Sequence, residues 1–320
     1  MRRTLPLVAA VAASGTWDCS TGRWEPRVDV AAARACAVLQ RYDEVVFAGD
    51  SLTRGLYQGL LLLVQGLTAD HGADRDQIAG GSLWSSYLGK HEWQWQQPTH
   101  HRWWGSTAPL NKTSERGRAC ANGPDDQYTK IPCRLAIITD TFGVERVCGG
   151  RVTARFWWAW DAVEAGYAKL RTTVIAGFPL MGRSLLVTGH GLHAKHGAPY
   201  PALAGEWLRP LVAAAGGRHV DVVYHMVDAP GSRKPDQYVM TQGEARIALV
   251  NRGQSEQLHG WANTSTFPAN VTFLVADWFN LTHHANGCRH LRSFDGTHYG
   301  HVVNTEKARQ LVRSLELLPR

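Results

Sequence analysis

The sequence of 320 residues lacks any apolar run long enough to cross a bilayer: the run from Leu60 to Val64 is short and is followed by Gln65 and Gly66. It also lacks internal repeats and low-complexity tracts, either of which would argue for more than one structural unit. A chain of this length is long enough to bury a substantial core. We therefore expect one domain over residues 15–320, with residues 15–41 as a cysteine-containing arm that leads into it.

Runs of basic residues are absent as well. The formal net charge is +7, but the Lys and Arg residues are scattered, and no nucleic-acid-binding motif accompanies them. This distribution argues against DNA or RNA as a partner and is compatible with an acidic, pectin-like glycan.

Cysteine is scarce but even in number, with six residues, which is typical of a disulfide-bonded protein. Residues 1–14 combine a basic start, a short apolar run and small residues, so we interpret them as an N-terminal leader: either a marginal signal peptide or an unstructured terminus. Four N-glycosylation sequons begin at Asn111, Asn263, Asn270 and Asn280. These features together predict the secretory pathway, in the Golgi lumen or outside the cell, and three disulfides.

The pairing of the cysteines is open, because six cysteines allow fifteen connectivities. A Cys19–Cys36 bond would pin the N-terminal arm to the domain and would stabilise it by roughly 3 kcal/mol. A Cys120–Cys133 bond would close a turn-rich loop. Cys148 and Cys288 would then join the middle of the chain to its C-terminal part.

The clearest local pattern is a strand, a tight turn and a helix around Ser51. Val45, Val46 and Phe47 predict a buried strand, and Gly49 permits a sharp turn. Leucines 52, 56, 60 and 63 then recur at helical spacing. A serine at this junction lies at the carboxyl edge of the sheet, where the free N–H groups of the first helical turn can face an oxyanion.

A simple alternative is that Asp50 or Ser51 only caps the helix. A second pattern, near the C-terminal end, favours catalysis: Asp295 and His298 lie three residues apart on a turn that contains Gly296. This spacing allows the carboxylate to hold one imidazole nitrogen while the other faces a serine. Asp277 also follows the last predicted strand, but we expect it to bind loop backbone or to cap a helix.

The motifs Gly-Asp-Ser-Leu at 49–52 and Asp-x-x-His at 295–298 resemble those of the SGNH (GDSL) hydrolase superfamily. Within it, several further motifs resemble the PC-esterase group, which includes trichome-birefringence-like and sialate O-acetyltransferase-type proteins. They are Arg54, Gly15-Thr-Trp17, Trp24-Glu-Pro26, Leu186-Val-Thr-Gly-His190 and the segment 271–282, which holds the strand before the catalytic pair. Gly55 stands where the plant members carry Asn, and the Cys and Trp-Cys around their histidine are absent. The resemblance is therefore to the wider group and spans about residues 15–318.

The resemblance implies a Ser-His-Asp mechanism, with Ser51 as nucleophile, His298 as base and then acid, and Asp295 as its orienting carboxylate. It implies that the Ser51 N–H, a glycine at 80 or 81 and His190 stabilise the oxyanion. Arg54 would contact a sugar or a carboxylate, or would neutralise Asp50. No cofactor or metal is implied.

Tryptophans surround the predicted second strand end, and some of them are expected to line a cleft and stack on sugar rings, although packing alone is the default for any single one. They are Trp93, Trp95, Trp103 and Trp104. The histidines at 190, 193 and 196 offer a second interpretation, a zinc site, but the Gly-rich context does not match a zinc-protease pattern.

Predicted strands and helices alternate along the chain, which predicts an α/β fold with a doubly wound, mostly parallel sheet and helices on both faces. The expected strands include 134–139, 184–189, 219–226 and 271–276, and the expected helices 161–171, 200–215, 244–257 and 304–318. The chain is thus interpreted as an O-acyl, most simply O-acetyl, transferase or esterase with a glycan substrate and, for transfer, an acyl donor. The alternatives are a non-catalytic glycan-binding protein and a histidine-metal hydrolase.

Overall fold

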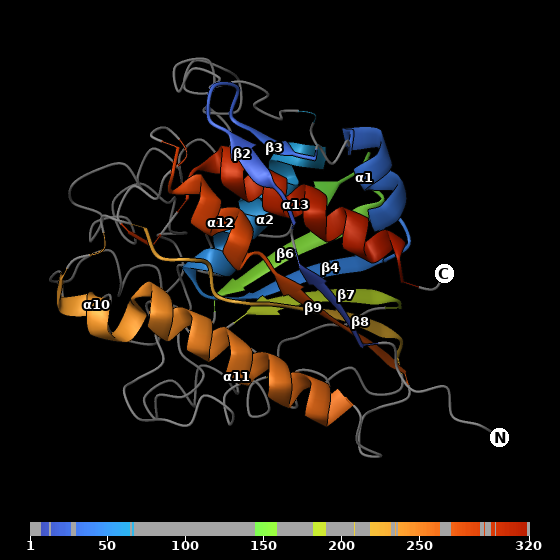
Figure 1. The fold of residues 1–320 in the computed structure, drawn as a ribbon. Coiled ribbons are helices and arrows are strands. Elements are labelled where there is room, and N and C mark those ends of the chain that lie inside the picture. Colours follow the sequence, from blue (N-terminus) through green and yellow to red (C-terminus); the bar gives the residue numbers. More distant parts are fainter. Residues whose placement is uncertain are drawn as a thin grey trace, which may run out of the picture.

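The computed structural model describes residues 8–12, 14–26, 30–64, 66, 145–158, 182–189, 208, 218–231, 234, 236–262, 270–288, 291, 296–297 and 299–318. Within them the chain forms a seven-stranded sheet covered by helices (Figure 1). In spatial order its strands are β1 (Val8–Ala12), β9 (Val271–Asp277), β8 (Val220–His225), β7 (Ser184–Gly189), β4 (Glu44–Gly49), β6 (Val152–Trp158) and β5 (Glu145–Val147). All neighbours pair in parallel except β5, which runs antiparallel to β6.

The central strands β4, β7 and β8 are buried along their whole length. Their near-continuous apolar sequences are what a parallel sheet covered on both faces requires. Four helices cover one face: α1 (Ala32–Leu39), α2 (Ser51–Val64), α12 (Phe279–Ala285) and α13 (His301–Glu316). The other face carries α10 (Asp236–Gln242) and α11 (Glu244–Ala262) (Figure 1). Trp261 of α11 packs edge-on against Phe273 of β9.

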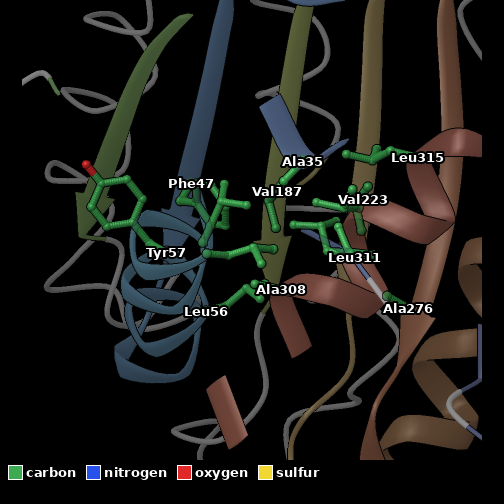
Figure 2. Close-up of a cluster of buried hydrophobic side chains, with 14 of the residues drawn as sticks. Ala35, Phe47, Leu56, Tyr57, Val187, Val223, Ala276, Ala308, Leu311 and Leu315 are labelled. Atoms are coloured by element: carbon green, nitrogen blue, oxygen red, sulfur yellow. The ribbon is translucent and has the colours of Figure 1, made fainter. Parts of the chain in front are cut away.

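The main core lies between the sheet and the helices α1, α2 and α13 (Figure 2). Phe47, Val187 and Val223 point from the sheet toward Leu56 of α2 and Leu311 of α13. The doubly wound, mostly parallel sheet predicted from the sequence is therefore confirmed, together with helices on both of its faces. The predicted strand at 134–139 and the predicted helices at 161–171 and 200–215 lie outside the described residues.

Helices α2 and α13 approach each other closely at Gly59. A Cβ atom at this position would lie 2.2 Å from the backbone oxygen of Asn304, too close for any side chain. Gly59→Ala should therefore lower the free energy of unfolding by about 1–3 kcal/mol, which urea denaturation measures. Gly253→Ala, in α11, is the matched control: its Cβ meets nothing within 4 Å, so it should stabilise the helix by up to about 1 kcal/mol. Equal effects of the two substitutions would contradict the close packing.

The N-terminal arm forms a small hairpin of β2 (Thr16–Asp18) and β3 (Arg23–Glu25), which the sequence analysis did not predict. The Trp17 ring nitrogen donates a hydrogen bond of 2.8 Å to the backbone oxygen of Leu281. Trp17 and Trp24 pack edge to face, with ring centroids 5.5 Å apart. The hairpin is thus attached to α12.

The disulfides correct the predicted pairing. Cys19 bonds to Cys288 and Cys36 bonds to Cys148, so the expected Cys19–Cys36 and Cys148–Cys288 bonds are wrong. The reason is spatial: the hairpin turn with Cys19 lies against α12, while Cys36 on α1 faces the turn between β5 and β6. These partners are 269 and 112 residues apart, so short sequence spacing could not identify them.

Cys120 and Cys133 lie outside the described residues, and no described cysteine is free. Two disulfides indicate an oxidising compartment, as expected for the secretory pathway. Among the described helices, none is both long and apolar enough to span a membrane.

The segment interpreted as a leader contributes β1 in this structure. Residues 8–12 pair in parallel with residues 273–277 at the edge of the sheet. Cleavage after residue 12 or 13 would remove β1 and leave β9 as the edge strand. The leader itself stays a prediction.

Candidate active site

Ser51 begins α2 two residues after the end of β4, the strand between β7 and β6. The predicted strand, turn and helix are therefore confirmed, and the serine backbone lies at the carboxyl edge of the parallel strands. The preceding carboxylate caps the helix: Asp50 Oδ1 accepts the backbone N–H of Leu52 at 2.9 Å and that of Thr53 at 3.5 Å. The Arg54 N–H donates to the backbone oxygen of Asp50 at 3.0 Å.

Two glycines permit close contacts beneath this turn. A Cβ at Gly49 would lie 2.1 Å from Thr53 Oγ1, and one at Gly189 would lie 2.4 Å from the ring of His225. The Thr53 hydroxyl and His225 Nε2 are 2.7 Å apart, and His225 Nδ1 lies 3.2 Å from the backbone oxygen of Met226. The neutral tautomer with its proton on Nδ1 satisfies both bonds, so Thr53 donates to Nε2. This pair ties the first turn of α2 to the end of β8.

A buried ion pair lies at the same edge. Lys307 of α13 donates to Asp228 Oδ2 at 2.7 Å, and their side chains are 0% and 2% exposed. The Lys307 ammonium also lies 5.7 Å from the centre of the Trp278 ring. Sequence reasoning missed this pair, although Lys307 lies four residues after Val303 and four before Leu311, on the apolar stripe of the helix. A lysine on such a stripe is a signal for a buried charge.

Asp50 belongs to the same group of charges. The pKa of its carboxyl is raised from 3.8 to about 6, and burial is the main cause. Nearby Asp228 also raises the pKa, whereas the bonds from Leu52 and Thr53 and the charge of Lys307 lower it. The folded protein therefore binds more protons than the unfolded chain between pH 3.8 and pH 6. Its stability consequently falls as the pH rises through this range, and the full cost remains above pH 6.

Asp50→Asn should remove this cost, because the amide is uncharged and its oxygen can still accept the Leu52 N–H. We expect the free energy of unfolding to rise by about 1–3 kcal/mol at pH 7.5 and the gain to shrink toward zero near pH 4. Chemical denaturation of both proteins at the two pH values measures this difference. A gain of the same size at both values would show that the carboxylate charge is not its cause.

The segment that contains the predicted catalytic pair is described on either side of His298. The Gly231 N–H donates to the backbone oxygen of Gly296 at 3.1 Å, and Lys234 Nζ donates to Thr297 Oγ1. The Tyr299 hydroxyl donates to the backbone oxygen of Ala229 at 2.6 Å. The flanking residues are thus bound to the segment that follows β8, at the carboxyl edge where α2 begins.

The triad itself is not described. Asp295, His298 and the side chain of Ser51 lie outside the described residues, so their roles stay predictions. Asp277 behaves as expected, because its Oδ1 accepts the backbone N–H of Phe279 at 2.9 Å at the start of α12.

Several other predicted residues also lie outside the described part of the chain. They are Gly80, Gly81, Trp93, Trp95, Trp103, Trp104, Asn111, His190, His193, His196 and Asn263. No described group of three or more His, Cys, Asp or Glu side chains could hold a metal ion.

Three predicted residues remain, Arg54 and the sequon residues Asn270 and Asn280, and they differ in exposure. Arg54 is 1% exposed, so its side chain reaches groups in the interior, a location that does not favour the predicted sugar contact. Lys307 is a cation that lowers the pKa of Asp50, and the role predicted for Arg54 beside that carboxylate stays a prediction. Of the two described sequons, Asn280 is exposed on α12, whereas the Asn270 amide donates to the backbone oxygen of Arg218.

A cavity of about 620 Å³ adjoins the 296–297 turn, since Gly231 and Lys234 line it and also bind that turn. Its other polar lining includes Asp236, His283 and Asn286. The lining therefore combines hydrogen-bond donors and acceptors, the set that sugar hydroxyl groups require.

No protein-family model matches the chain, and no curated protein matches it. Among solved structures, Est24, a carbohydrate acetylesterase from Sinorhizobium meliloti, aligns with 51% of this chain and 78% of its own, at 14% identity and a TM-score of 0.35. A similarity this low carries no argument about function. The strand order and pairing of the chain itself establish an α/β protein with a doubly wound, mostly parallel sheet.

Proposed function

We propose that this protein is a serine-dependent O-acyl esterase or transferase that acts on O-acetyl groups of a glycan. One observation carries the proposal: Ser51 begins a 14-residue helix directly at the carboxyl end of a central parallel strand. At this edge of a parallel sheet α/β proteins gather their ligands, and the helix N-terminus favours the negative charge that develops during acyl transfer.

The hydrogen bonds of the first turn support this role. The N–H groups of Leu52 and Thr53 bind the Asp50 carboxylate, and the Arg54 N–H binds the Asp50 backbone oxygen. In our proposal the Ser51 N–H serves the oxyanion. Each such donor lowers the barrier by roughly 3 kcal/mol. Gly80 or Gly81 and His190 are the further donors proposed from sequence.

The proposed reaction has two halves. Ser51 Oγ attacks the acyl carbonyl while His298, oriented by Asp295, takes its proton; the tetrahedral intermediate then expels the sugar oxygen, which receives that proton from His298. The resulting acyl-enzyme is attacked by water, which gives hydrolysis, or by a sugar hydroxyl, which gives transfer. In either case His298 takes the proton of the attacking water or hydroxyl group and then gives it to the Ser51 oxygen as the acyl group leaves.

The surroundings are consistent with a glycan substrate. The cavity of about 620 Å³ beside the 296–297 turn has the size and the mixed polar lining to take a sugar unit. The two disulfides are consistent with work in an oxidising compartment, the Golgi lumen or the extracellular space.

Covalent labelling tests the proposal. A fluorophosphonate should add one mass equivalent to the disulfide-intact protein, and peptide mapping should place it on Ser51. Heat-denatured protein should not react, and a chelator should not change the rate. Absence of labelling, or labelling at another serine, would contradict the nucleophile; a loss of esterase activity with chelator would favour a metal hydrolase. A screen of acyl donors and glycan acceptors by mass spectrometry would then separate transfer from hydrolysis.

A further inference from the structure

Three strands end at one group of buried charges beneath the start of α2. Asp50 follows β4, Asp228 follows β8 and Trp278 follows β9. Lys307 of α13 is ion-paired with Asp228, lies 5.7 Å from the centre of the Trp278 ring and lowers the pKa of Asp50. We call Asp50, Asp228 and Lys307 the charge cluster. It brings two carboxylates and one ammonium into an interior where an uncompensated charge costs several kcal/mol.

We infer that Asp228 and Lys307 are positioning residues for the proposed reaction: through Asp50 they fix the first turn of α2, which carries Ser51. The inference rests on the proposed function. It goes beyond that function by giving a role to residues that the proposed mechanism does not use.

The geometry gives the route of this effect. Asp50 Oδ1 accepts the N–H groups of the two residues that follow Ser51. A carboxylate accepts these bonds about twice as strongly as a neutral acid, so protonation of Asp50 loosens the turn. Lys307 favours the charged form of Asp50, and Asp228 opposes it. The two residues therefore act on the turn in opposite directions.

Other ionisable groups lie near this turn as well. His225 is bonded to Thr53 and to the Met226 backbone, and buried Arg54 lies one turn into α2. Glu306, next to Lys307, is bound by Arg309 and Gln310. The Asp50 carboxyl is the group on which both Asp228 and Lys307 act.

The stability cost of Asp50 favours a functional role. Its raised pKa means that the ionised carboxylate destabilises the fold at neutral pH, and an amide at the same position could still cap the helix. Residues that reduce stability in this way concentrate at functional sites.

The test is the rate of fluorophosphonate labelling of Ser51 in the full, disulfide-intact chain between pH 5 and pH 9, with the folded fraction measured at each pH. In the wild type, labelling should slow as the pH falls through the pKa of Asp50. Lys307→Met should move this decrease in labelling rate to higher pH, and it should slow labelling at least tenfold at pH 7. Asp228→Asn keeps the side-chain shape and should move the decrease in labelling rate to lower pH. The proposed base, His298, is the same in all the variants, so only the displacement between their profiles carries the inference.

Two controls separate positioning from general stability. Asp221→Asn removes a buried carboxylate at the other end of β8, which pairs with Arg183 at 3.1 Å, and it should keep the wild-type profile at equal folded fraction. In an Asp50→Asn background, Lys307→Met and Asp228→Asn should no longer displace the profile. If Lys307→Met does not fold, the shift of Asp228→Asn decides alone.

The outcomes are distinct. Opposite displacements that vanish with Asp50→Asn support the inference. Profiles that coincide with the wild type, or that shift equally in Asp221→Asn, overturn it while the labelled serine upholds the proposed function. A wild type that is not labelled at Ser51 overturns both.

Discussion

Ser51→Ala is expected to reduce turnover of an O-acetylated glycan roughly 10⁴-fold or more, because the variant lacks the proposed nucleophile and the nearby Thr53 hydroxyl is buried and bonded to His225. The fold should survive. The helix cap comes from the Asp50 carboxylate, whose bond to the Leu52 N–H does not involve the serine hydroxyl. The free energy of unfolding should therefore change by less than about 1 kcal/mol. Release of acetate measures turnover, and urea denaturation measures stability.

Ser255→Ala is the matched control, since Ser255 lies half-buried in α11 on the opposite face of the sheet. It should leave both turnover and stability nearly unchanged. Retention of more than a small fraction of the wild-type rate by Ser51→Ala would show that another residue is the nucleophile. A loss of activity that follows a loss of folded protein would assign a structural role to Ser51.

The elements around Ser51 were predictable because their patterns are local. The strand β4 and the helix α2 follow from the apolar run 45–47, from Gly49 and from the leucines at helical spacing. The strands β7, β8 and β9 were predicted from similar apolar runs. The closing helix begins at His301, three residues before its predicted start. The strand β6, which lies just before the predicted helix at 161–171, was not among the predicted strands.

Features that depend on distant partners were not predictable from local pattern. The bonds Cys19–Cys288 and Cys36–Cys148 form only after the hairpin and α1 have packed against other elements. The charge cluster likewise joins residues 50, 228 and 307: the first two follow β4 and β8 at one edge of the sheet, and the third lies on α13. A single sequence gives the face on which Lys307 lies but not the carboxylate that it meets.

Asp277 ends the last strand, β9, and Asp295 comes after it in the chain, but we expect the first to cap a helix and the second to act in catalysis. The kcat values of their amide variants should therefore differ sharply. Asp295→Asn should lower kcat by roughly 10⁴-fold at nearly unchanged melting temperature, because the amide can neither hold the required imidazole tautomer nor stabilise the imidazolium. Asp277→Asn should leave kcat within about twofold, since its carboxylate binds the Phe279 N–H at the start of α12. Its melting temperature should fall only slightly, by up to about 2 °C, because the amide oxygen can still accept the Phe279 N–H but lacks the negative charge that a helix N-terminus favours.

Both quantities are needed from both variants, because a fall in kcat alone could reflect lost protein. The two substitutions exchange the same atoms, a carboxylate oxygen for an amide nitrogen, so each is the other's chemical control. Their difference depends on the turn at 296–297, which Gly231 and Lys234 hold at the carboxyl edge of the sheet. If Asp277→Asn lost kcat at constant melting temperature while Asp295→Asn stayed active, the carboxylate of the triad would be the one at the end of β9.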